Sequence, residues 1–148
     1  MKQWLENLAV ITATFWIGGL WVVGFVAYEL FKMIPEAQLA GNIAGQLFKM
    51  MAYVGMASSI YLLIQRVYQY GTNALKQGFF WLILLMLILI LVSHLGINPL
   101  LEKFKLEAMP KDVMESIFAD RFSTWHGISS IAYLLECVLG VFAILKIR

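Results

Sequence analysis

Four ionisable side chains lie within, or at the edges of, long apolar stretches of the sequence: Glu29, His94, His126 and Glu136. Because an ionisable group costs about 2.5–3.5 kcal/mol on insertion at the centre of a bilayer, each of them is a candidate functional residue. Glu136 has no lysine or arginine at its depth in the stretch, so its carboxyl needs water or another polar partner. Any chemistry of this chain therefore starts from these four residues.

The polar residues around the two histidines are spaced to form two stripes on neighbouring helices. His94 and Asn98 are four residues apart and share one helix face. On the next helix, Ser130 falls within about 40° of His126 when residues are counted at 100° each. If the two stripes face each other, His94 and His126 meet at similar depth, with Arg121 at the mouth of the pocket. We predict a ligand-binding site whose members share this polar pocket: His94, Asn98, Arg121, His126, Ser130 and Glu136.

Several ligands fit such a pocket. His94 and His126 can together hold haem or a divalent metal, although two histidines without a third ligand are a weak metal signal. A His–Glu series can relay protons or bind a coupling cation, and a polar crevice can hold a lipid head group or a small organic solute. A purely structural role, in which the histidines hydrogen-bond across helices, competes with all of these. The sequence contains no nucleophile elbow, phosphate loop or cysteine–histidine pair with catalytic spacing, so nothing argues for an enzyme.

The elements that must position these residues are membrane-spanning helices. Hydrophobic residues make up 61% of the chain and charged residues only 14%, whereas a soluble domain carries about 25% charged residues. A helical span takes about 20 apolar residues. We predict an all-α polytopic membrane protein, an antiparallel four-helix bundle in which residues 1–148 form a single membrane domain. Its predicted parts are spans at about 8–31, 49–66, 79–101 and 125–145, an amphipathic extension at 36–48, and a polar loop at 102–124.

The topology and the surroundings of the protein follow from these spans. Four spans place both termini on the same side of the bilayer, and basic residues clustered near the helix ends favour the cytoplasmic side. We expect a multi-pass protein of a bacterial inner membrane. The formal net charge of +2 and the absence of long basic runs argue against nucleic acid as a partner.

Small residues spaced four apart mark faces on which helices can approach closely. One group lies in the amphipathic extension and another in the first span, and the members are Gly18, Gly19, Ala40, Gly41, Ala44 and Gly45. The plainest interpretation is packing within one bundle. A homo-oligomer, or docking to a membrane-protein partner through the helix that carries Ala40–Gly45, is the alternative.

Several short motifs follow one another along nearly the whole chain: WIGG at 16–19, AGNIAGQLF at 40–48, NP at 98–99 and RFSTWHGIS at 121–129. In this order they resemble the DUF4149 family of small membrane proteins, which includes the eukaryotic transmembrane protein 205. The resemblance implies four membrane helices but no established activity, and a link of the eukaryotic relatives to drug or metal-compound resistance gives thin support to transport. It marks Gly41, Gly45, Arg121 and His126 as landmarks, whereas Glu136 matches none.

Taken together, the residues predict a non-enzymatic membrane protein that binds or moves a small solute or ion. A haem- or metal-binding redox protein is the first alternative. An accessory or assembly subunit of a membrane complex is the second.

Overall fold

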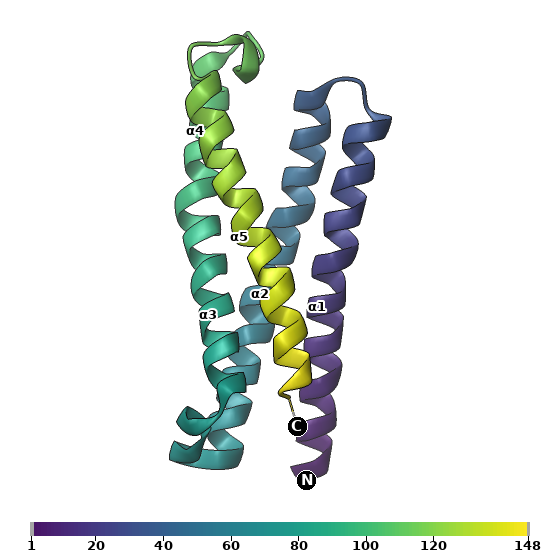
Figure 1. Cartoon of the computed structure of the whole chain (residues 1–148), viewed down its shortest axis with the longest axis vertical. Helices are drawn as coiled ribbons and strands as arrows, with labels where there is room; N and C mark the ends of the chain where they lie inside the picture. Colours follow the sequence, from purple (N-terminus) through teal and green to yellow (C-terminus); the bar gives the residue numbers. More distant parts are fainter. Residues whose placement is uncertain (1, 148) are drawn as a thin grey trace.

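The computed structural model describes residues 2–147, which are helical almost throughout and contain no strand (Figure 1). The long helices are α1 (Lys2–Met33), α2 (Ala37–Tyr70), α3 (Gly78–Val92), α4 (Asn98–Ala108) and α5 (Ala119–Leu145). Three short helical turns join or interrupt them: η1 (Gly71–Lys76), η2 (Ser93–Ile97) and η3 (Val113–Glu115). The turn η2 is a π-helical turn, so α3, η2 and α4 follow one another as a single rod.

Four helical stretches are long and apolar enough to cross a membrane: Gln3–Met33, Ala37–Lys76, Gly78–Ala108 and Ala119–Leu145. Their outer faces carry large exposed apolar side chains such as Phe15 and Leu95. A soluble protein rarely leaves so much apolar surface uncovered, whereas lipid covers it at no cost. The predicted all-α membrane bundle with four spans is confirmed.

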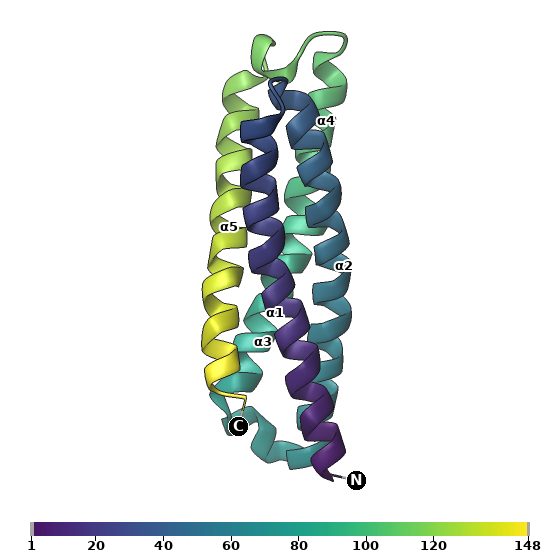
Figure 2. The ribbon, with the colours of Figure 1, turned by 90° about the vertical axis from the view of Figure 1, so that its right-hand side faces the viewer.

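The helices run alternately up and down (Figures 1 and 2). We call the end where α1 begins and α5 ends the terminus end of the bundle. The opposite end, with the turn between α1 and α2 and the loop between α4 and α5, is the long-loop end. Both α2 and α5 therefore run from the long-loop end to the terminus end.

The loop between the third and fourth spans is shorter than the predicted 102–124. The rod continues through Ala108, and α5 already begins at Ala119. The charged residues that suggested a loop instead pair along the helix, with Lys105 at 3.0 Å from Glu102 and Lys103 at 3.7 Å from Glu107. Such pairs support a helix beyond the end of its apolar run.

Two glycines let the bundle close around a large buried tryptophan. Trp16 of α1 is completely buried, and a Cβ on Gly55 of α2 would lie only 2.8 Å from its Nε1 atom. On α5, a Cβ on Gly140 would lie 2.9 Å from a methyl carbon of Ile17. Both positions thus depend on the missing side chain, and they place α1 firmly between α2 and α5.

Candidate functional site

The predicted site residues of α5 differ widely in exposure. Arg121, His126 and Ser130 are exposed, whereas Glu136 is only 5% exposed. The Ser130 hydroxyl donates a hydrogen bond to the His126 carbonyl of its own helix, and the His126 ring stacks on Phe122 at 5.7 Å between centroids. The N-terminal half of the stripe on α5 therefore faces outward.

Contacts between aromatic rings fix the depth of the two histidines. The His94 ring packs edge-on against Tyr53 of α2, with 5.0 Å between the ring centroids. Tyr133 of α5 packs against Phe48 of α2, with 4.7 Å between the ring centroids. Tyr53 lies five residues beyond Phe48, and His126 lies seven residues before Tyr133. Because α2 and α5 run in the same direction, these two offsets add to twelve residues. At 1.5 Å per residue, His126 is therefore about 18 Å nearer the long-loop end than His94. The predicted meeting of His94 and His126 is wrong, so they cannot hold one metal ion or haem between them.

The two histidines lie at different depths because the helices that carry them extend unequally beyond their apolar runs. The prediction counted both histidines from the ends of the apolar runs and so placed them at equal depth. The rod in fact extends to Ala108, 14 residues beyond His94, whereas α5 begins at Ala119, only seven residues before His126. The unequal helical extensions outside the apolar runs displace the two rings.

The same register brings Glu136 to the depth of His94. Tyr133 lies at the level of Phe48, and Glu136, three residues further along α5, lies about 4.5 Å nearer the terminus end. Tyr53 and the His94 ring that packs against it lie about 7.5 Å nearer the terminus end than Phe48. The turn that carries His94 also packs against α5. Two of the predicted site residues are therefore brought to one level, although they are not the two that were expected to pair.

Trp16 adds a third polar group at nearly the same level. Its Nε1 atom lies beside Gly55, two residues beyond Tyr53 on α2. We call Trp16, His94 and Glu136 the mid-bundle polar layer. Their levels span about 6 Å along the bundle.

None of the three groups has a polar partner within residues 2–147. Trp16 Nε1 and His94 Nδ1 are enclosed and make no hydrogen bond there. The Glu136 carboxyl, although buried, takes part in no hydrogen bond or ion pair of that range. Because nearly all buried polar groups in proteins are paired, and an unpaired one costs about 1–3 kcal/mol, three at one level need an explanation.

The layer offers complementary chemistry. The indole N–H is a donor, the imidazole nitrogen is a donor or an acceptor, and the carboxyl accepts or carries a proton. His94 lies within a π turn, a distortion that recurs at functional sites in helices. A water molecule, a proton, a small cation or a small polar solute can satisfy such a set.

A second polar cluster ties the helices together at the long-loop end. The Lys105 ammonium donates to Asn42 Oδ1 of α2 at 2.9 Å and to Glu102 at 3.0 Å, and its side chain is only 18% exposed. We name Asn42, Glu102 and Lys105 the long-loop junction.

Sequence reasoning missed the polar roles of Trp16, Asn42 and Lys105. Trp16 was considered only as part of the WIGG motif, although a donor N–H deep in an apolar run is itself a signal of a polar role. Asn42 stood inside a motif assigned to small residues, and Lys105 was placed in the loop. The spacing of three between Glu102 and Lys105 would have indicated a helix there.

The predicted packing residues occupy different environments. Ala40 and Ala44 are buried inside the bundle, Gly41 faces Phe31 of α1, and Gly19 faces Met51 of α2. Gly18 and Gly45 have no neighbouring atom within 4 Å of a Cβ position. Within the described chain, only part of this set therefore mediates close approach of helices.

No group of three or more His, Cys, Asp or Glu side chains among the described residues is arranged to hold a metal ion. Metal or haem binding thus gains no structural support from a cluster, and it is left as a prediction.

The fold and the apolar outer faces define a multi-pass membrane protein with a polar layer inside a four-helix bundle. The family described as "Domain of unknown function (DUF4149)" matches residues 11–110, and the chain belongs to this family. No curated protein and no solved structure matches the chain. Trp16 and His94 lie within the matched region, whereas Arg121, His126 and Glu136 on α5 lie beyond it.

Proposed function

We propose that this protein binds a small solute or ion in the mid-bundle polar layer and carries it through the bilayer. The observation that carries the proposal is the presence, at one level, of two enclosed nitrogens without a partner within residues 2–147, Trp16 Nε1 and His94 Nδ1, together with the buried Glu136 carboxyl, which no ion pair of that range holds. Structural hydrogen bonding would leave such groups paired.

The chemistry of the layer favours a proton or a small monovalent cation, alone or together with a polar solute. Glu136 supplies a carboxyl and His94 an imidazole nitrogen, and both can serve as acceptors toward a cation. No lysine or arginine of the described chain forms an ion pair with Glu136. The carboxyl is therefore available to an incoming positive charge.

The remaining predicted residues mark a route from the long-loop end. Asn98 is half-buried and lies four residues from His94, about 6 Å nearer that end. Ser130, His126 and Arg121 follow on α5 at increasing distance from the layer. In this proposal they assist access of the ligand, and Glu136 and His94 hold it.

Binding is tested with the purified full chain in detergent. The midpoint of thermal unfolding is measured in LiCl, NaCl and KCl against choline chloride at equal ionic strength, because a ligand of the folded state raises the midpoint. Glu136→Gln keeps the shape of the side chain and removes its charge. Glu29→Gln is the matched control, since Glu29 is an exposed carboxylate that pairs only with Lys32.

Transport is tested in liposomes that contain a pH-sensitive dye and are polarised by a potassium gradient with valinomycin. We expect proton uptake above that of empty liposomes, its loss in Glu136→Gln, and its retention in Glu29→Gln. The proposal is wrong if no cation stabilises the wild type and it moves no protons. It is equally wrong if Glu136→Gln behaves like the wild type in both assays.

A further inference from the structure

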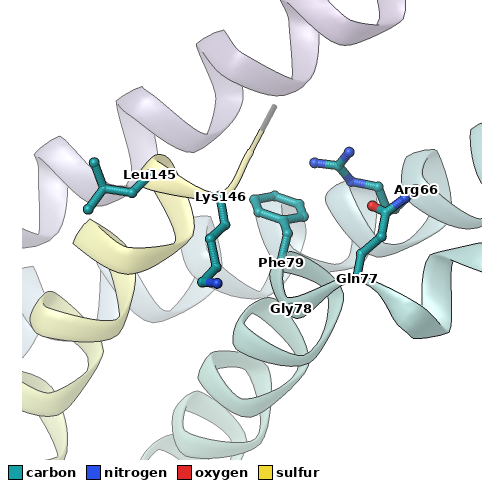
Figure 3. A pocket seen from close by; sticks show the side chains of 6 residues that line it. All are labelled: Arg66, Gln77, Gly78, Phe79, Leu145 and Lys146. Carbon is teal, nitrogen blue, oxygen red and sulfur yellow. The ribbon is translucent and has the colours of Figure 1, made fainter.

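A pocket of about 320 Å³ lies at the terminus end of the bundle (Figure 3). It opens where the last part of α2, the start of α3 and the end of α5 meet. Its lining residues are Arg66, Gln77, Gly78, Phe79, Leu145 and Lys146. Since a water molecule takes up about 30 Å³ in the liquid, the pocket has room for a small anion together with several waters.

Arg66 brings a buried positive charge to this pocket. The residue is only 6% exposed, and its guanidinium lies over the Phe79 ring at 4.3 Å from the centroid. One N–H group donates to the carbonyl of Ile147, but the enclosed Nε has no acceptor within residues 2–147. No carboxylate of that range forms an ion pair with Arg66, and the nearby Glu6 instead accepts a hydrogen bond from Gln69.

A buried charge is costly where no counter-ion meets it, and within residues 2–147 no carboxylate pairs with Arg66, so this part of the chain favours a negatively charged ligand. Of the two basic side chains in the pocket, Arg66 has the flat, forked donor set that matches phosphate and carboxylate oxygens.

The start of α3 adds further positive character. Gln77 does not cap the helix with its side chain, and the backbone N–H groups of Gly78 and Phe79 donate to no acceptor in the described part of the chain. Free N–H groups at a helix N-terminus carry a partial positive charge and bind anions, phosphate above all. Lys146, directly after the end of α5, lies over the same turn, its Nζ 3.6 Å from the Cβ position of Gly78.

The pocket also lies at the level of a membrane–water interface. Trp81, one turn into α3, is 55% exposed, and its indole N–H donates to the Leu75 carbonyl. Trp4 is exposed near the start of α1, at the same end. Exposed tryptophans with one polar contact are typical of the interfacial belt, where the phosphates of phospholipids lie.

We propose that this pocket binds a phosphate group through Arg66, Lys146 and the N-terminal turn of α3. The phosphate belongs either to an anionic phospholipid of the adjacent leaflet or to inorganic phosphate. The proposal does not depend on the mid-bundle polar layer, so Glu136→Gln leaves phosphate binding unchanged.

The test uses the purified full chain in a buffer free of phosphate and sulfate. Inorganic phosphate is titrated by calorimetry, and dioctanoyl phosphatidylglycerol is counted on the protein by native mass spectrometry, with dioctanoylglycerol as the probe that lacks phosphate. Lys146→Gln is the main variant, because an exposed lysine is replaced without loss of fold. Lys76→Gln removes another exposed lysine at the same end, outside the lining of the pocket, and is the matched control.

We expect Lys146→Gln to weaken binding about fivefold to tenfold, as for a charged hydrogen bond that is partly open to water, and Lys76→Gln to change it less than twofold. Arg66→Gln abolishes binding if it folds. Binding of inorganic phosphate identifies a free anion, and binding of phosphatidylglycerol alone identifies a lipid. Binding of neither probe overturns the proposal, as do equal effects of the two lysine variants or equal binding of dioctanoylglycerol.

Discussion

We predict that replacing Glu136 by leucine makes this protein more stable and abolishes its proposed function. In the structure Glu136 is only 5% exposed, and its carboxyl forms no hydrogen bond or ion pair within residues 2–147. An unpaired buried polar group carries its full desolvation cost of about 1–3 kcal/mol, and the apolar side chain of leucine carries no such cost. We therefore expect Glu136→Leu to raise the free energy of unfolding by about 1–3 kcal/mol.

The measurement is unfolding of the purified chain by SDS in mixed micelles, followed by circular dichroism. Glu29→Gln is run alongside and stays within about 0.5 kcal/mol of the wild type, as is usual for an exposed group. The reasoning is refuted if Glu136→Leu loses more than about 1 kcal/mol. That result would show that the carboxyl has a structural partner, and that the polar layer exists for folding.

Other substitutions test the packing and the depth of the candidate residues by the same unfolding assay. Gly55→Ala forces a methyl group against Trp16 and costs about 1–2 kcal/mol, because overpacking outweighs the better helix propensity of alanine; an unchanged stability would contradict the close approach. Gly18→Ala has open space and gains up to about 1 kcal/mol, so a loss would reveal a hidden contact. Tyr133→Phe removes a hydrogen bond to a carbonyl of α1 and costs about 0.5–1.5 kcal/mol; no change would mean that the bond contributes nothing. His126→Ala leaves cation binding in the layer within about twofold of wild type, because His126 lies about 18 Å from His94 along the bundle, and loss of binding would restore a role for the histidine pair.

Hydrophobicity alone was sufficient to predict the class of fold. The run from Phe79 to Val92 is apolar on every face, and such a segment has no place in a soluble domain of this size. The polar ends of the helices were less predictable. Residues 102–108 look like a loop by composition, and only their pairing at spacings of three and four shows the helix.

The candidate site depended on a quantity that hydrophobicity does not encode, the axial register of one helix against another. That register is set by how far each helix continues beyond its apolar run, and by the two glycines that admit Trp16 and Ile17. The residue types were found, since His94 and Glu136 were both selected. Their partnership and the contribution of Trp16 could be seen only once Phe48 and Tyr53 fixed the depth of the rings around them.

The loop between α4 and α5 has a consequence for how this molecule can be taken apart. It lies in residues 109–118, at the point where the family match ends, and a cut there leaves one piece with three spans and one piece with a single span. Spanning helices are stable in a bilayer before they associate, so the two pieces can insert separately and join by diffusion in the plane of the membrane. Neither piece alone contains the whole mid-bundle polar layer, because Trp16 and His94 lie on the first and Glu136 on the second. The proposed cation binding, measured in cells that make both pieces, would therefore report on helix assembly.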